Sequence, residues 1–121
     1  MIEELEKTEL EEIIAQYRLC AINHGRAIKE GDSVIANRNY DKLVKLLGQI
    51  REYGTEGDVA LFSLTEDEDQ SVRCWAATDS LKYDERRAKK VLKKLSKEKG
   101  IIAFDAKMVL NEWKKGHLHH M

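Results

Sequence analysis

The side chains that could carry out chemistry are few and scattered along this chain. Cys20 and Cys74 stand far apart and lack a CxxC spacing, so the sequence predicts neither a zinc motif nor a disulfide framework. His24 could serve as a ligand or a general base, but it lies on an apolar helical stripe that carries no second candidate ligand. We therefore interpret His24 as a residue at the edge of the core.

Three further histidines, His117, His119 and His120, follow Gly116. They could bind a transition metal loosely, but we interpret them as part of a frayed tail. The sequence has no glycine-rich phosphate loop, GxSxG elbow, HExxH motif or EF-hand spacing. No histidine lies near a cysteine or serine in a way that suggests a nucleophile and its base. We predict a protein that is not an enzyme and needs no metal or cofactor.

Charge is distributed unevenly along the sequence. The net charge of −1 conceals two acidic runs and one basic run. Residues 1–12 hold six Glu and one Lys, residues 55–69 hold six acidic residues and no basic one, and residues 82–99 hold nine basic and three acidic residues. Each run could be a solvated helix face that keeps the protein soluble. Alternatively, a charged surface accelerates association with an oppositely charged partner, by about 10–1000-fold at low salt.

Helices must position these residues. The 121 residues match one domain of typical size, and they include no proline, the main helix breaker. No apolar run approaches the ~20 residues that a membrane helix needs, and the acidic start is unlike a signal peptide, which predicts a cytoplasmic protein. We predict a single all-α domain over residues 1–121. It has about six helices: from a capping box at Thr8 to Gly31, from near Asp32 to Gly54, over 58–64 with Thr55 as cap, over 71–82, from the Asp84 cap to Gly100, and over 102–115.

Apolar residues at steps of three and four predict the buried face of each helix. The inward set of the second helix is predicted to be Ala36, Tyr40, Leu43, Val44, Leu47 and Ile50. That of the sixth helix is predicted to be Ile102, Ala106, Val109, Leu110 and Trp113. The last four helices also match as two pairs at an offset of thirty positions, which aligns Val72 with Ile102 and Ala76 with Ala106. Such a period is typical of stacked helical hairpins.

The stretch 69–77, DQSVRCWAA, resembles the second helix of a HEAT repeat: an acidic turn, then Val-Arg, then small residues. Val72 and the alanines allow close approach of neighbouring helices, and Arg73 can bridge to an acidic turn. The proline that often opens that turn in HEAT repeats is missing here.

Residues 16–118 resemble a family of small bacterial helical proteins of unassigned function. The resemblance is carried by RNYDKL at 38–43, VRCWAA at 72–77 and LNEWKKG at 110–116. Members of that family look like immunity proteins encoded beside polymorphic or contact-dependent toxins. The resemblance implies HEAT-like stacked helices and neutralisation of a toxin by binding.

We predict partner-binding residues on three elements. The acidic loop Glu66-Asp67-Glu68-Asp69 can present carboxylates to a basic cleft. On the fourth helix, Trp75, Thr78, Asp79 and Lys82 share one side at i, i+3, i+4 and i+7, and the second helices of a HEAT-like stack line the concave binding surface. Asp105 and Glu112 on the sixth helix would continue that surface. Trp75 could instead pack on the next hairpin.

The leading hypothesis is a cytoplasmic immunity protein that forms a one-to-one complex with a cognate toxin domain, a nuclease, and blocks its active site or its access to substrate. The runner-up is a HEAT-like nucleic-acid-binding module that uses the basic helix 86–97. Five lysines on that helix are predicted to face outward: Lys89, Lys90, Lys93, Lys94 and Lys97. Against this alternative, no aromatic residue interleaves the basic face for base stacking. A third possibility is a scaffold that recruits another protein.

Overall fold

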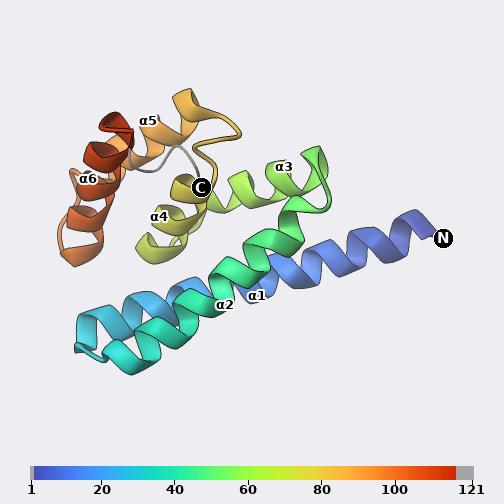
Figure 1. Ribbon diagram of the computed structural model, residues 1–121, viewed down its shortest axis with the longest axis horizontal. Coiled ribbons are helices and arrows are strands. Elements are labelled where there is room, and N and C mark those ends of the chain that lie inside the picture. Colours follow the sequence, from blue (N-terminus) through green and yellow to red (C-terminus); the bar gives the residue numbers. More distant parts are fainter. Residues whose placement is uncertain (1, 117–121) are drawn as a thin grey trace. The chain divides into compact units, whose positions relative to one another are not determined.

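The fold is all-α, as the sequence predicts. The computed structural model describes the backbone of residues 2–116 and the side chains of residues 8–116, so the three C-terminal histidines lie outside the described residues and the earliest glutamates are described by their backbone alone. Six α-helices and one short 3-10 helix make up this part of the chain (Figure 1). They are α1 (Ile2–Glu30), α2 (Ser33–Arg51), α3 (Thr55–Ser63), the 3-10 helix η1 (Leu64–Glu66), α4 (Gln70–Asp79), α5 (Glu85–Leu95) and α6 (Ile101–Lys114).

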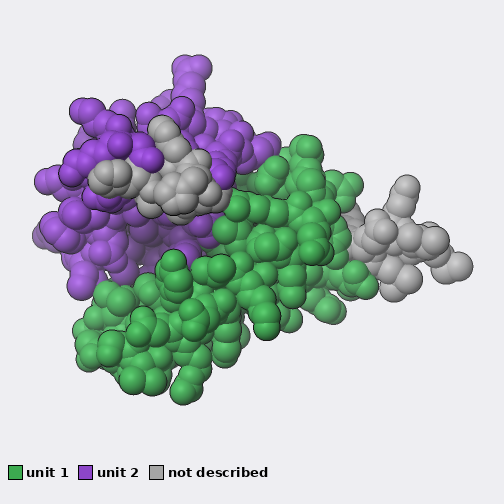
Figure 2. Space-filling model, in the orientation of Figure 1, with its two compact units in different colours: residues 1–63 green, residues 64–121 purple. Residues whose placement is uncertain are grey.

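The helices group into two compact units, unit 1 over residues 1–63 and unit 2 over residues 64–121 (Figure 2). Helices α1, α2 and α3 pack together in unit 1, and η1, α4, α5 and α6 pack together in unit 2. The match at an offset of thirty positions treats α3 and α4 as one helix pair. The boundary between the units separates these two helices. No helix in the described part of the chain is long and apolar enough to cross a membrane.

In unit 1, helices α1 and α2 form an antiparallel hairpin. Gly31 ends α1 with a φ of +73°, and the N–H of Asp32 donates to the carbonyl of Ala27 at 2.9 Å, which satisfies a carbonyl that the helix end would leave unpaired. The carboxylate of Asp32 then accepts from the N–H of Ile35 at 3.1 Å and caps α2. One Gly-Asp pair thus stops one helix and starts the next.

Helix α1 begins earlier than predicted. It starts at Ile2, so Thr8 lies inside the helix and does not cap it. The residues before Thr8 are mostly Glu, Leu and Lys, which are strong helix formers, so nothing in that stretch favours a later start.

The buried face of α2 also differs from the prediction. Tyr40 and Val44 are 51% and 53% exposed, while Asn39 and Leu46 are buried. The buried positions are Ala36, Asn39, Leu43, Leu46 and Ile50. They follow alternating steps of three and four, the narrow spacing of a seam between two helices, whereas the prediction assumed a wider stripe. Asn39 tolerates burial because its side-chain Nδ2 donates to the carbonyl of Ile35 at 3.0 Å.

Helix α3 lies close to the end of α2 at a glycine. Gly54, with a φ of +62°, turns the chain, and α3 begins at Thr55 immediately after it. A Cβ atom at Gly57 would lie 2.0 Å from the carbonyl oxygen of Ile50, so only glycine fits at this corner without backbone movement.

Helix α4 is central to unit 2, where it packs against η1, α5 and α6. Its small buried residues allow this close packing: Ser71, Val72, Cys74, Ala76 and Ala77. The apolar cluster of the unit joins α4 and the following turn to α5 and α6 through Leu81, Ala88, Leu92, Leu95, Ile102, Ala106 and Trp113. Trp113 is 6% exposed, which confirms its prediction as a core residue, and Val109 and Leu110 lie at the cluster's edge.

Two helix ends in unit 2 fall earlier than predicted. Helix α4 ends at Asp79, because the chain must leave the helix before Asp84, whose carboxylate caps α5 by accepting from the N–H of Arg87 at 3.1 Å. Helix α5 ends at Leu95, and Gly100, with a φ of +99°, precedes α6 instead of ending α5. Lys82 and Lys97 consequently lie in turns, outside the helices to which the sequence assigned them.

Candidate functional site

The acidic loop Glu66–Asp69 joins η1 to α4 in unit 2. The carboxylate of Asp69 accepts from the N–H of Val72 at 3.0 Å and caps α4. Asp67 Oδ1 accepts from the N–H of Asp69 at 2.9 Å, which fixes the loop itself. Glu66 and Glu68 are exposed. Two of the four carboxylates therefore shape the loop, and the other two are directed to solvent.

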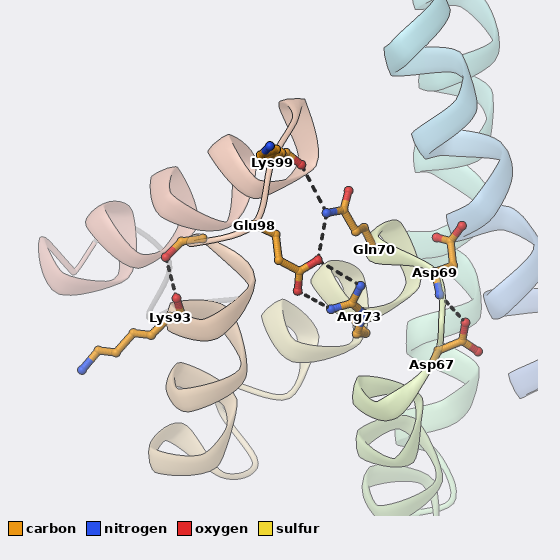
Figure 3. A network of polar contacts seen from close by, with 8 residues as sticks. Asp67, Asp69, Gln70, Arg73, Lys93, Glu98 and Lys99 are labelled. Carbon is orange, nitrogen blue, oxygen red and sulfur yellow. Dashed lines mark hydrogen bonds and ion pairs between the residues drawn. The ribbon is translucent and has the colours of Figure 1, made fainter.

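A polar clamp holds the start of α4 to the turn before α6 (Figure 3). Arg73 Nη1 and Nη2 donate to the Glu98 carboxylate at 2.7 and 3.3 Å, and Gln70 Nε2 donates to the same carboxylate at 2.9 Å and to the carbonyl of Lys99 at 3.2 Å. The hydrogen bonds from Arg73, followed by that from Gln70, lower the pKa of Glu98. Arg73 thus pairs with the turn between α5 and α6, whereas the acidic loop is fixed by its own hydrogen bonds.

The α4–α6 face carries most of the other predicted partner-binding residues. Trp75, Thr78 and Asp79 on α4 are half-buried, as are Asp105 and Glu112 on α6. Thr78 Oγ1 donates to the carbonyl of Cys74 at 2.7 Å. Lys82 is exposed in the turn after α4 and does not continue the helical stripe.

Carboxylates from both helices act on the buried thiol of Cys74. Burial above all, together with the nearby charges of Asp105 and Asp79, raises the pKa of the Cys74 thiol to about 12, against a hydrogen bond with Thr78 that lowers it. Asp79 and Asp105 therefore both lie near Cys74, although they come from different helices. The sequence assigns Asp79 and Asp105 to one binding surface, and that assignment stays a prediction.

Sequence reasoning missed an apolar ridge on α6, formed by Ile101, Phe104 and Met108. These side chains are 45%, 60% and 42% exposed. Their spacing of i, i+3 and i+7 is readable from the sequence, but the predicted buried stripe of α6 accounts for only one of its two apolar faces. At 100° per residue, Ile101, Asp105, Met108 and Glu112 share one row, so apolar and acidic side chains alternate along the exposed side of α6.

His24 and Cys20 lie on α1, where both side chains are half-buried. Burial raises the pKa of the Cys20 thiol, and the Lys42 ammonium partly opposes this. Among the described residues, no three His, Cys, Asp or Glu side chains are placed to hold a metal ion together. A shallow cavity of about 200 Å³ lies in the α1–α2 hairpin, between Asn23 and Arg26 on one helix and Ile35 and Asn39 on the other.

No protein-family model matches the sequence, and no curated protein matches it. Among solved structures, the chain is similar to the protein RPA1889 from Rhodopseudomonas palustris CGA009. The two share 20% sequence identity and superpose with a TM-score of 0.81, over 88% of this chain and 89% of the other. This likeness concerns the fold.

Proposed function

We propose that this protein is an immunity protein, which binds a cognate toxin domain in the bacterial cytoplasm and blocks its active site or its access to substrate. The proposal rests first on the resemblance of 38–43, 72–77 and 110–116 to a family whose members look like immunity proteins. The single structural observation that supports it is the combination of exposed carboxylates and exposed apolar side chains on unit 2. A surface of this composition suits a protein partner.

The acidic loop would provide electrostatic attraction. Glu66 and Glu68 are exposed, and the loop that carries them is held by internal hydrogen bonds of Asp67 and Asp69, so their position costs little further ordering on binding. A nuclease that binds polyanions has a basic cleft, and carboxylates aimed at such a cleft would increase the association rate.

The α4–α6 face would provide affinity. Phe104 and Met108 expose apolar surface beside the acidic residues Asp105 and Glu112, and Trp75 is half-buried on the neighbouring helix. Interface energy concentrates in a few large apolar and aromatic side chains that lose contact with water, and charges at the rim set the partner and the rate. A toxin domain with an apolar patch inside a basic surface would match both features.

The test is binding to the C-terminal domain of the protein encoded immediately upstream. We expect a one-to-one complex by calorimetry, protection of growth on co-expression, and an association rate that decreases with salt. The double variant Glu66→Lys, Glu68→Lys should reduce the association rate at least tenfold at low salt, because it inverts the steering charges without altering the capping carboxylates.

The matched control is Glu11→Lys, Glu12→Lys, which makes the same charge change at two exposed positions of α1. We expect this control to associate at nearly the wild-type rate. An absence of both complex formation and growth protection would rule out the immunity function. A complex that both double variants slow equally would retain the function but remove the acidic loop from the interface.

A further inference from the structure

Helix α5 carries a row of basic side chains opposite its buried stripe. The buried residues Ala88, Leu92 and Leu95 are at most 1% exposed. Arg86, Lys90 and Lys93 lie on the other side of the helix at i, i+4 and i+7, and Lys97 follows in the next turn at i+11. All four are exposed, and together they define the α5 row.

The acidic residues near α5 are paired with cations outside this row. Asp84 accepts from Arg87 Nε at 2.6 Å, and Glu98 is held by Arg73 at 2.7 Å. Glu85 lies 3.3 Å from Lys89 Nζ and also accepts from the indole N–H of Trp113. Lys89, predicted to face outward with the other four lysines, is half-buried and paired with Glu85. In residues 8–116 no carboxylate forms an ion pair with the α5 row.

We propose that the α5 row binds the phosphate backbone of double-stranded nucleic acid, independently of sequence. This inference is separate from the immunity function and does not depend on it. A phosphate backbone is a partner for which positive charge alone supplies the affinity, through release of condensed counterions. Single-stranded nucleic acid is usually bound by aromatic side chains on which its bases stack, and no aromatic residue lies between Asp84 and Lys97. The row therefore favours a double strand.

Two other polyanionic partners fit the row less well. A protein interface concentrates its energy in apolar or aromatic anchors, whereas the fully exposed residues between members of the row are Arg87 and Lys94, and the apolar Val91 is half-buried. An amphipathic helix that enters a membrane surface uses its apolar face, but the apolar face of α5 is buried in the cluster with Ile102 and Trp113.

The row has a quantitative consequence for salt dependence. Four phosphate contacts give a slope of about −3.6 for log Kobs against log salt, which is a loss of about 100-fold in affinity between about 50 and 200 mM. Each contact that is removed should make the slope shallower by about 0.9.

The experiment is fluorescence anisotropy of a short labelled DNA duplex with the full chain. At about 50 mM salt, the double variant Lys90→Glu, Lys93→Glu should weaken binding at least tenfold. The matched control, Lys107→Glu, Lys114→Glu, makes the same charge change at two exposed positions of α6, and it should bind within threefold of wild type. A second variant, Lys90→Ala, Lys93→Ala, preserves helix propensity and should make the salt slope about 1.8 shallower. Circular dichroism verifies that each variant is folded.

Two other polyanions are tested at the same concentration of negative charge as the duplex: vesicles with anionic headgroups, and poly-glutamate. They show whether the α5 row prefers nucleic acid to a membrane surface or to an acidic polypeptide. Tighter binding to the duplex than to either probe, with selective loss in the α5 variants, supports the proposal. It is overturned if the duplex does not bind at about 50 mM salt, if either probe binds as tightly as the duplex, or if the α6 control weakens binding as much as the α5 variant.

Discussion

The two units solve the problem of packing helices in different ways. Unit 1 uses two long helices joined at Gly31-Asp32, and their contact is a narrow seam around Leu43 and Ile50. Unit 2 packs the two helices α5 and α6 and the 3-10 helix η1 against α4, and its turns are fixed by carboxylates: Asp69 and Asp84 cap helices, and Glu98 holds Arg73. Long helices need few turns, whereas short helices bring many helix ends to the surface.

This difference accounts for where the candidate binding features lie. The acidic loop, the apolar ridge of α6 and the α5 row all belong to unit 2, where exposed turns and helix ends are frequent. The carboxylates of the acidic loop differ in what they do in the fold, since one pair holds the loop and the other pair is free of that task. Asp67 and Asp69 hold the loop, and Glu66 and Glu68 remain exposed.

The largest expected effect is on the apolar cluster of unit 2. Trp113→Ala should lower the free energy of unfolding by about 3–5 kcal/mol, because it leaves a cavity among Ala106, Leu92 and neighbouring residues. Urea denaturation followed by circular dichroism measures the loss. Phe104→Ala on the same helix is the control, since that side chain is 60% exposed, and its cost should stay below about 1 kcal/mol. Equal costs for the two substitutions would contradict the assignment of the cluster.

The corresponding test of unit 1 is at the α2–α3 corner. Gly57→Ala should cost about 3 kcal/mol, because the added methyl group meets the backbone oxygen of Ile50 and the helices must separate. Gly48→Ala offers a matched control within α2, where a Cβ atom has no neighbour within 4 Å. This control should stabilise the protein by about 1 kcal/mol through helix propensity. A neutral Gly57→Ala would mean that the corner is not tightly packed.

The reactivity of the two cysteines offers a comparison of the units, because Cys20 lies in unit 1 and Cys74 lies in unit 2. The thiol of Cys74 is buried and its pKa is raised to about 12, while Cys20 is half-buried and Lys42 opposes the rise of its pKa. Because the thiolate is the reactive species, Cys20 should react with a disulfide reagent at pH 8 at least tenfold faster than Cys74. Cys20→Ser should remove the fast phase of labelling, and Cys74→Ser should leave it intact.

The smallest expected effect concerns the polar clamp. The pKa of Glu98 is lowered in the folded state, so its contribution to stability is complete above the unfolded pKa and is lost as the pH falls through the folded pKa. Glu98→Gln should cost no more than about 1 kcal/mol at neutral pH, because the pair lies at the surface. The difference between variant and wild type should shrink in acid titrations monitored by thermal unfolding. A difference that does not change with pH would assign the effect to packing instead of charge.

Local signals in the sequence were sufficient for the fold class and for several element ends. Asp84 and Gly31 mark helix boundaries through side-chain capping and a positive φ, both of which depend on a few neighbouring residues. The core position of Trp113 followed from the apolar period of its helix. These features can be predicted because the interactions that produce them are short in sequence.

Two of the features that were missed depend on contacts distant in sequence. The buried face of α2 turned from Tyr40 towards Asn39 because α1 packs along a narrow line, which the sequence of α2 alone does not specify. Arg73 pairs with Glu98, twenty-five positions away, and any of several carboxylates could have been chosen from the sequence. The assignment of Asp79 and Asp105 to one binding surface combines the helical spacing with the HEAT resemblance, and it stays a prediction.

The corner between α2 and α3 provides a way to find distant relatives. Ile50, Gly54 and Gly57 are separated by four and three positions, and each contributes differently to the corner. Ile50 provides the carbonyl that α3 approaches, Gly54 makes the turn with a positive φ, and Gly57 allows the close approach because it has no side chain. A motif of one aliphatic residue and two glycines at this spacing, between two amphipathic segments, can be searched in genomes without reliance on overall sequence identity. Any chain that forms this bend in the same way needs glycine at the position of Gly57, even where its surface residues differ.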